Sequence, residues 1–191
     1  MTAGDAEIGG GNTRWAPPPD TPAAALVGQV DYPMWVVTTA DGWETSGCLA
    51  GFVTQCSIRP PRFLVCLSKQ NHTFFVVERS GALAIHLLGH DQHELAAHFG
   101  ELSGDVVDKM AGQSWWRGST GAPLLTECAA WVEGRVIRHL GVGDHEAFVV
   151  SCDRGGPGPH AGQLSYRQAR DLRPGHPATD ATTLESATGN A

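Results

Sequence analysis

The stretch that decides the fold is residues 47–68, which read GCLAGFVTQCSIRPPRFLVCLS. Three of its first five residues are Gly or Ala, so the main chain there is open to the close approach of another group. The double proline at 60–61 predicts a rigid corner, because each proline fixes its own φ and favours extended geometry in the residue before it. Residues 62–68 are apolar and of strand length, which indicates a buried strand. We therefore predict a small-residue strand, a corner and a second strand that leave backbone groups exposed.

Local signals predict the elements on either side of this stretch. Asp41-Gly42 tolerates the positive φ of a tight hairpin turn, so the stretch is expected to return beside the strand before it. Thr73 is expected to cap a helix that ends at Gly81. The predicted elements are a short helix over 26–30, a strand over 32–39, a helix over 74–79 and a strand over 82–88.

The second half of the chain mixes helix and strand signals. Asp91 and Glu94 predict a capping box, and Leu95 and Phe99 would then share one face of the helix that follows. The further predicted elements are a short helix over 105–110, a loop over 115–118, strands over 128–139 and 146–152, and a last strand over 163–166 that closes the sheet.

These elements predict a mainly β fold. About six strands with short connections favour antiparallel pairing, whereas the regular strand and helix alternation of a parallel doubly wound sheet is missing. We predict a split antiparallel β-barrel, Greek-key-like in its connections, with a few flanking short helices. The domain would span residues 26–170, between a flexible arm at 1–25 and a flexible tail at 171–191.

Composition limits the class of function. The 191 residues are 41% hydrophobic and 17% charged, as in a globular protein. A net charge of −7 without a block of Lys or Arg argues against binding to nucleic acid or to an anionic membrane. The sequence has no apolar run of membrane-span length and no secretion signal, so we expect a cytoplasmic protein. Its five cysteines lack CxxC spacing and are expected to be free and mostly buried.

The sequence contains no convincing motif for nucleophilic catalysis or for metal binding. The sequence has no Gly-x-Ser-x-Gly elbow, and burial would make Cys56 inert as a nucleophile beside His145. His93 and His98 are one residue too far apart for the zinc-protease motif, and on a helix they would point about 140° apart. We expect no metal site, and we expect the histidines over 86–98 to face solvent or to pack against the barrel.

Four pieces of the chain, in order, resemble the flavin reductase-like family, whose domain is an FMN-binding split barrel. The first is the opening stretch with its double proline, and the last is Gly143-Asp144-His145. Between them lie a helix with Gln92, Leu95, Ala96 and Phe99, and the turn Gly121-Ala122-Pro123-Leu124. The resemblance covers roughly residues 31–166. It implies FMN or FAD as the flavin and NADH or NADPH as co-substrate.

The resemblance implies that the opening stretch holds the flavin ring. Isoalloxazine is flat and mostly apolar with a polar edge, so its site needs an apolar wall and a few main-chain partners. The family usually has hydroxyls where this chain has Leu49, Gly51 and Phe52, so the backbone or nearby polar side chains would have to compensate. Alternatively, the small residues accommodate Trp35 or Phe63 in a tightly packed strand. The predicted flavin contacts are Gly47, Cys48, Leu49, Ala50, Gly51, Phe52, Gln55, Ser57 and Phe99.

The flavin phosphate would lie between the end of a strand and the start of a helix. N–H groups point outward at such a place, and Lys69 adds a positive charge. In the family this region serves the same purpose. The predicted phosphate contacts are Ser68, Lys69, Asn71 and Thr73. The alternative is an ordinary helix start beside an exposed lysine.

Gly143-Asp144-His145 is the candidate for the reacting face. By resemblance, His145 stands near the nicotinamide and helps to orient it over the flavin, with Asp144 beside it. Hydride transfer needs the nicotinamide carbon and the flavin nitrogen held about 3 to 3.5 Å apart, and positioning supplies the rate. The alternative is a turn in which Asp144 caps its own backbone and His145 lies on the surface.

The expected function is reduction of FMN or FAD by NADH or NADPH. By resemblance the enzyme would be a homodimer that feeds a separate flavin-dependent monooxygenase. The runner-up is a non-catalytic flavin-binding or other small-ligand-binding protein on the same barrel, which the missing hydroxyls keep open. A barrel that binds no ligand would leave Gly143-Asp144-His145 without a role, and a deazaflavin in place of flavin is a further alternative.

Overall fold

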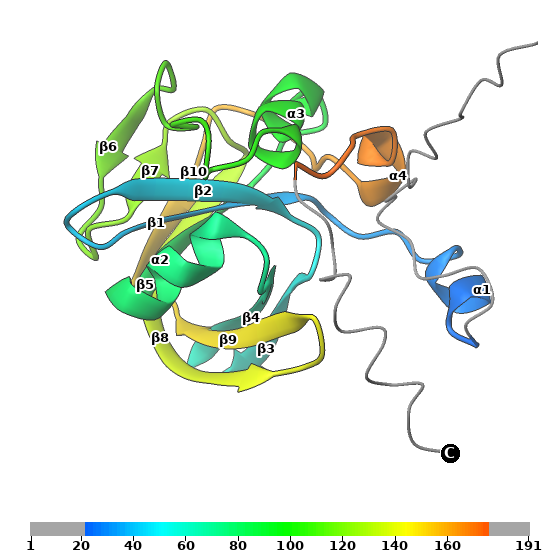
Figure 1. The fold of residues 1–191 in the computed structure, drawn as a ribbon, viewed down its shortest axis with the longest axis horizontal. Coiled ribbons are helices and arrows are strands. Elements are labelled where there is room, and N and C mark those ends of the chain that lie inside the picture. The colour runs from blue at the N-terminus through cyan, green and yellow to red at the C-terminus, as the bar shows by residue number, and fades with distance from the viewer. Residues whose placement is uncertain (1–21, 176–191) are drawn as a thin grey trace, which may run out of the picture.

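A computed structural model of the chain describes residues 22–175, which form ten strands and four helices (Figure 1). The strands are β1 (Trp35–Ala40), β2 (Thr45–Ala50), β3 (Val53–Ile58), β4 (Pro61–Ser68), β5 (Ala82–Leu87), β6 (Trp115–Arg117), β7 (Pro123–Leu125), β8 (Ala130–Gly141), β9 (His145–Ser151) and β10 (Arg154–Pro157). The helices are α1 (Ala24–Val27), α2 (His72–Ser80), α3 (His93–Glu101) and α4 (Tyr166–Ala169).

One antiparallel sheet forms the barrel, with the strand order β2-β1-β5-β8-β9-β4-β3. The two edge strands, β2 and β3, are consecutive in the sequence, and Gly51-Phe52 carries the chain from one edge to the other. We call this dipeptide the crossing. The sequence predicted a single strand ahead of the prolines, and this was wrong: β2 pairs with β1, whereas β3 pairs with β4. The predicted split antiparallel barrel is confirmed.

The double proline makes the turn between β3 and β4, as predicted. Ile58 pairs with Pro61, and the Arg59–Pro60 peptide bond is cis. The hydroxyl of Ser57 donates to the carbonyl of Pro60 at 2.6 Å. The corner is therefore a β-hairpin turn, and the strand after it, β4, lies between β3 and β9.

Helix α2 packs against the interior of the barrel (Figure 1). Its Phe74 and Val77 belong to a core with Val65 of β4 and Phe148 of β9. Gly81 ends the helix in the left-handed conformation that glycine adopts readily, as predicted. The cap was predicted two residues too late, because the side chain of Asn71, not that of Thr73, accepts the N–H bond.

Helix α3 covers the outer face of β1 and β2. Leu95 and Phe99 lie on its buried face, as predicted, in a second core with Met34, Leu164 and Leu172. The predicted capping box is absent at the start of this helix. Its N-cap is Gln92, which makes no side-chain cap bond, and the Asp91 carboxylate lies 3.0 Å from Nδ1 of His160 instead.

Three other predicted elements differ from the structure. The predicted helix over 105–110 consists of turns, and the predicted loop at Trp115 forms strand β6, which pairs with β7. Residues 163–166 form no strand with the sheet: Ser165 makes one bridge to Pro33, and α4 follows. The predicted tail also begins later than 171, because Leu172 is buried in the second core.

His86 of β5 joins three strands in the interior. Its side chain is fully buried, with Nδ1 3.1 Å from the carbonyl of Val36 and Nε2 accepting from the N–H of Leu125 at 3.1 Å. Burial lowers the pKa of this imidazole to about 4. His86 is therefore a neutral structural group that ties β7 to β5 and β1.

All five cysteines are free, as predicted, although Cys56 is exposed. Among residues 22–175, no helix combines the length and the apolar character needed to cross a membrane. Most of the arm predicted at 1–25 and of the tail predicted at 171–191 lies outside the described residues.

Candidate functional site

A cleft of about 520 Å³ opens beside the crossing. We call it the crossing cleft. It is lined by Tyr32, Pro33, Trp35, Gly51, Phe52, Val53, Thr54, Gln55, Phe63, Leu64 and Cys66. The lining is aromatic and aliphatic apart from two uncharged polar side chains, and backbone of the crossing forms one wall. This is the combination that a flat, mostly apolar ligand with a polar edge requires.

The ring of Tyr32 packs directly on Gly51. A Cβ at position 51 would lie 2.5 Å from Cε2 of Tyr32, so only glycine allows the ring to approach this closely. Tyr32 also stacks on Tyr166, with ring centroids 4.8 Å apart, and lies 6.0 Å from the ring of Phe52. Burial raises the pKa of the Tyr32 phenol well above its usual range, with smaller contributions from Tyr166 and Asp31. The phenol therefore stays protonated.

Two buried donors of the cleft lack a partner among the described residues. They are the hydroxyl of Tyr32 and Nε1 of Trp35. A buried polar group without a hydrogen bond is costly, and such groups often meet a water molecule or a ligand. Both donors belong to side chains that line the cleft, although the two atoms themselves are covered.

Phe52 and His145 lie next to each other at the rim of the cleft. Their ring centroids are 5.4 Å apart, and Phe52 is 47% exposed. Nδ1 of His145 lies 2.8 Å from Oδ1 of Asp144, so the carboxylate fixes the orientation of the imidazole and leaves Nε2 available. The crossing and the Gly143-Asp144-His145 motif are distant in the sequence, yet the fold brings them together.

The end of β4 holds the turn that carries His145. Ser68 is the β-sheet partner of His145, and the N–H of Lys69 donates to the carbonyl of Asp144 at 3.0 Å. Nζ of Lys69 donates to the carbonyl of Gly143 at 3.0 Å and lies 3.8 Å from the carboxylate of Glu146. Ser68 and Lys69 therefore lie beside the candidate reacting face, whereas the resemblance implied that they contact the flavin phosphate.

Asn71 and Thr73 are used inside the protein. The Asn71 side chain accepts from the N–H of Thr73 at 2.9 Å, which makes it the helix cap. Thr73 is fully buried, and its hydroxyl lies 2.9 Å from that of Ser46. The alternative of an ordinary helix start describes these two residues better than a phosphate contact.

The first part of the predicted flavin segment lies in the interior. Cys48, Leu49 and Ala50 are buried. Phe99 is 1% exposed and packs on Gly47, where a Cβ would lie 2.7 Å from its ring. The side chains of Cys48, Leu49, Ala50 and Phe99 are thus parts of the core, and a flavin contact from Cys48, Leu49 or Ala50 would have to come from the backbone. The sequence also allowed that the small residues make room for the ring of Trp35 or Phe63. Gly47 does make room for an aromatic ring, but the ring is that of Phe99.

The remaining predicted contacts divide between the cleft and the corner. Gly51, Phe52 and Gln55 line the cleft. Ser57 lies at the β3–β4 turn, where its carbonyl accepts from Nε2 of Gln55 at 3.0 Å. Ser57 therefore does not line the cleft but contacts Gln55, which does.

The sequence interpretation missed part of the cleft wall. The missed lining residues include Tyr32, Trp35, Phe63, Leu64 and Cys66. A glycine at position 51 indicates that another group packs closely against it. Which side chain packs there depends on long-range strand pairing, which a single sequence does not reveal. Trp35 and Phe63 had been named only as rings that Gly51 or Gly47 might accommodate.

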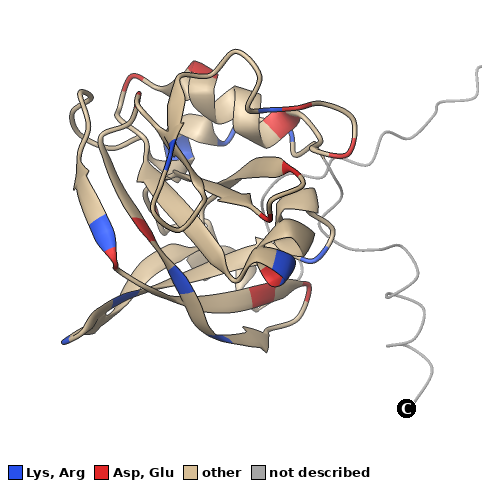
Figure 2. Ribbon diagram, turned by 90° about the vertical axis from the view of Figure 1, so that its left-hand side faces the viewer, with Lys and Arg blue, Asp and Glu red and all other residues tan. Residues whose placement is uncertain are grey.

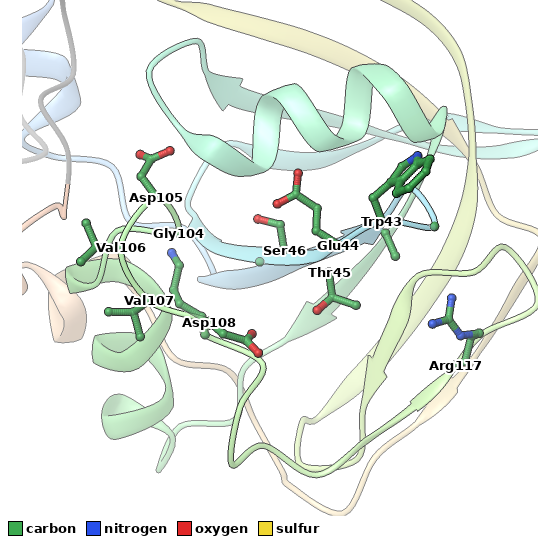
Figure 3. Close-up of a pocket in the computed structure, with 14 residues that line it drawn as sticks. Trp43, Glu44, Thr45, Ser46, Gly104, Asp105, Val106, Val107, Asp108 and Arg117 are labelled. Carbon is green, nitrogen blue, oxygen red and sulfur yellow. The ribbon is translucent and has the colours of Figure 1, made fainter.

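A second hollow of about 520 Å³ lies at the other end of β2 (Figure 3). We call it the Trp43 cleft. Figure 3 shows Thr45 and Ser46 on one side, the loop from Gly104 to Asp108 opposite, and Arg117 at the far end. Trp43 is 95% exposed at its rim. Its lining residues are Ala40, Gly42, Trp43, Glu44, Thr45, Ser46, Gly47, Gly104, Asp105, Val106, Val107, Asp108, Lys109 and Arg117.

Ion pairs brace the Trp43 cleft. Arg79 of α2 contacts the carboxylates of Asp41 and Glu44, and its bond to Asp41 measures 2.7 Å. His72 lies between two carboxylates, 2.8 Å from Glu44 and 2.9 Å from Asp105. The bond from Arg79 lowers the pKa of Asp41 to about 2. Two carboxylates of the cleft lining, those of Glu44 and Asp105, are therefore paired with side chains that lie outside the lining.

Histidines of the predicted cluster also have separate partners. His93 lies 3.0 Å from Asp171, and Nε2 of His98 lies 2.7 Å from the carbonyl of Lys109. Within the part of the chain that the structure describes, no group of three or more His, Cys, Asp or Glu side chains is placed to hold a metal ion.

The fold and the crossing cleft define the class as a split β-barrel with a site at the junction of its edge strands. The chain belongs to the family described as flavin reductase like domain, whose model matches residues 27–173. This match bears out the resemblance seen in the sequence.

Relatives of known name support the same family. A ferric-chelate reductase (NAD(P)H) of Archaeoglobus fulgidus is 32% identical over 123 residues, 63% of this chain and 73% of that protein. A 4-hydroxyphenylacetate 3-monooxygenase reductase component of Klebsiella oxytoca is 30% identical over 118 residues, 60% of this chain and 68% of that protein.

A solved structure agrees with the fold. The NADH:FAD oxidoreductase SgcE6 of Streptomyces globisporus C-1027 matches with a TM-score of 0.70 and 26% identity. The match covers 76% of this chain and 86% of that one.

Proposed function

We propose that this protein is an NAD(P)H:flavin oxidoreductase that reduces FMN or FAD. The observation that carries the proposal is the crossing cleft itself, an apolar hollow with open backbone on one wall and the Phe52–His145 pair at its rim. The family match and the reductase names of the relatives support it.

The residues present fit a flavin ring. Gly51, Phe52 and Gln55 would hold its polar edge through backbone and amide groups, and Tyr32 and Trp35 would face its apolar part. When bound, the flavin supplies the chemistry of hydride acceptance from a reduced nicotinamide. Cleft walls of aromatic rings also keep water away from the reacting atoms.

His145 is the residue that we assign to the nicotinamide. Asp144 holds its imidazole by the 2.8 Å contact at Nδ1, so Nε2 is presented as the free ring nitrogen. Contact between this nitrogen and the nicotinamide amide would fix the angle of the co-substrate, and correct orientation contributes a large part of the rate of such reactions.

We also propose the assembly and context expected from the sequence. A homodimer would cover apolar side chains that the single chain exposes, including Ile58, Leu140 and Val142. The Klebsiella oxytoca relative is named as a monooxygenase reductase component, which supports a flavin-dependent monooxygenase as the acceptor of reduced flavin. Five free cysteines agree with a reducing, cytoplasmic location.

A second candidate is a non-catalytic flavin-binding protein. The observation in its favour is the lack of hydroxyl side chains at Leu49, Gly51 and Phe52. Purified protein would be mixed with NADH or NADPH, with and without added flavin, and nicotinamide oxidation followed at 340 nm, the wavelength at which reduced nicotinamide absorbs. Flavin-dependent oxidation supports the reductase, whereas flavin binding without oxidation supports the alternative and overturns the first proposal.

A further inference from the structure

The two most exposed large hydrophobic side chains of the described residues line the same hollow. Trp43 is 95% exposed and Val106 is 84% exposed, and Val107, on the same loop as Val106, is 40% exposed. All three belong to the lining of the Trp43 cleft, a space of about 520 Å³. Single apolar side chains are normal on a protein surface, whereas a group of them around a hollow marks a candidate interaction site.

The turn that carries Trp43 is held in place, although almost all of the tryptophan is exposed. Oδ1 of Asp41 accepts from the N–H groups of Trp43, at 3.0 Å, and of Glu44, at 3.1 Å. Arg79 of α2 donates to the other oxygen of Asp41 at 2.7 Å, and Gly42 supplies the positive φ of the turn. The β1–β2 turn is therefore fixed to α2, and it presents Trp43 to solvent on a rigid support.

The opposite wall of the hollow is tied to this turn. His72 of α2 bridges the two walls, 2.8 Å from Glu44 and 2.9 Å from Asp105. Gly104 lies against the same histidine, because a Cβ at position 104 would be 3.2 Å from Cβ of His72. The hollow is thus formed before a partner arrives, and a preorganised site loses little conformational entropy on binding.

The acidic side chains around the hollow favour a cationic partner. Glu44, Asp105 and Asp108 line it. The side chains of Glu44 and Asp105 stay 38% and 60% exposed, although Arg79 and His72 contact them from outside the lining. The Asp108 carboxylate accepts from the N–H of Met110 at 2.9 Å and forms no ion pair with a described residue. Carboxylates that are still open to solvent can attract a further positive charge.

Two cations line the hollow, and neither is paired with these acids. The ammonium of Lys109 donates to the carbonyl of Phe99 at 3.0 Å, and this lysine is 5% exposed. Arg117 lies at the far end, where its guanidinium is 3.5 Å from the carbonyl of Gly121 (Figure 3). Figure 2 faces the side of the molecule that bears the β1–β2 turn. It shows Lys and Arg gathered on the strands in the lower part of the view, with Asp and Glu more frequent on the helices and loops above them.

We propose that the Trp43 cleft is a docking site for a protein partner that presents a Lys or Arg side chain beside apolar residues. The face of an indole ring attracts such cations, and tryptophan is a frequent anchor of protein–protein interfaces. Val106 and Val107 would contact the apolar flank of the partner. Because the cleft lies at the opposite end of β2 from the crossing cleft, a docked partner would leave the crossing cleft open.

A short cationic peptide tests the proposal on the full chain. The probe is acetyl-Ala-Leu-Arg-Leu-Arg-Ala-amide, and in two control peptides Gln or Glu replaces each Arg. The dissociation constant Kd would be measured from the NMR signals of the tryptophan indole N–H groups, among which that of Trp43 is the one missing in Trp43→Ala. We expect this signal to shift with a Kd of about 1 mM or lower at 50 mM salt, and the Kd to rise at least about fivefold at 500 mM salt. Absence of binding, or equal binding of the Gln peptide, would overturn the proposal.

Substitutions in the cleft test which side chains make the contact. Trp43→Ala should weaken binding of the Arg peptide at least about tenfold, and Asp108→Asn about threefold. The matched control is Trp116→Ala, which removes another exposed tryptophan that does not line the cleft and should leave the Kd within about twofold. All three side chains are exposed, so the variants are expected to fold and to reduce flavin as the native protein does. Unchanged peptide binding by Trp43→Ala would contradict the proposal.

Two further outcomes decide between occupants and separate this inference from the proposed reductase, on which it does not depend. If sedimentation shows self-association of the native chain that is lost in Trp43→Ala, a second copy covers the cleft and the proposal is wrong. If the peptide does not bind but flavin-dependent nicotinamide oxidation is present, the docking site falls and the reductase stands.

Discussion

The two clefts lie at opposite ends of β2, and they have the same volume but opposite chemistry. Both measure about 520 Å³. The crossing cleft is lined by aromatic and aliphatic groups, whereas the Trp43 cleft is lined by three carboxylates, Lys109 and Arg117. Size therefore says nothing about which hollow is the site. The lining decides, because an apolar wall favours a flat, mostly apolar ligand.

The two clefts also differ in the interactions that stabilise their walls. Arg79 and His72 brace the Trp43 cleft with ion pairs to Asp41, Glu44 and Asp105. At the crossing cleft the contacts are between rings, with Tyr32 on Gly51 and Phe52 beside His145. Substitutions at the two ends should thus affect different properties, stability at one and ligand chemistry at the other.

The largest effect is expected at Gly51. In Gly51→Val the new side chain would occupy the space of the Tyr32 ring, and overpacking of this kind costs about 1–3 kcal/mol. Displacement of Tyr32 into the cleft should lower kcat/KM for flavin reduction by about a hundredfold. The control is Gly156→Val on β10, where the nearest atom to a Cβ is 3.6 Å away. Partial recovery in the double variant Gly51→Val/Tyr32→Ala would show that the clash is the cause.

Between about pH 6.5 and pH 4, acid should destabilise the fold through His86 rather than through the ion pairs of either cleft. Its pKa is about 4 in the fold and about 6.5 in an unfolded chain, so the unfolded chain binds more protons between these values. Stability is therefore complete above about pH 6.5 and falls by up to about 3 kcal/mol as the pH drops to 4. Urea unfolding at several pH values measures the slope, which His86→Gln should remove. A slope that persists in this variant would place the acid sensitivity elsewhere.

His145→Ala should separate rate from affinity. Loss of the ring that Asp144 orients is expected to slow nicotinamide oxidation about tenfold to thirtyfold, because positioning is lost. The Kd for flavin should stay within about twofold, since the cleft wall is intact. Stopped-flow oxidation and a flavin titration on the same preparation measure the two quantities. Equal losses in both would contradict the assignment of His145 to the nicotinamide.

The smallest effect is expected from Arg79→Ala in the Trp43 cleft. Exposed ion pairs contribute little, so the melting temperature should fall by about 2 °C or less, and flavin reduction should be unchanged. The pKa of Asp41 is lowered to about 2, so the pair is complete above about pH 4 and is lost as the pH falls toward 2. The difference between variant and native protein should accordingly be constant from pH 5 to 8. A large loss of activity would mean that this cleft takes part in catalysis.

Local signals in the sequence predicted local structure well. Gly81 ended its helix where a left-handed residue was needed, and the double proline made its turn. Signals failed where strand pairing decides. The residues around Trp115 did not show the short hairpin that β6 forms with β7, and the small residues before the prolines did not show that the chain leaves one edge of the sheet at Gly51 and joins the other.

The candidate site was predicted in the same uneven way. Phe52 and His145 come from motifs that stand out by themselves, and the fold places them side by side. Tyr32 was missed because its contact with Gly51 depends on how β1 lies against β2. The side chains of Cys48 on β2 and Phe99 on α3 both point into the core, where the alternation of the strand and the buried face of the helix place them.

The position of Gly51-Phe52 between the two border strands has a dynamic consequence. A ligand that grips this dipeptide would hinder the barrel from opening along its seam, because β2 and β3 are joined there. Amide hydrogens of both strands should then exchange with deuterium more slowly, and to a similar extent, once the ligand is present. The bound flavin would then also stabilise the junction between β2 and β3 against local unfolding.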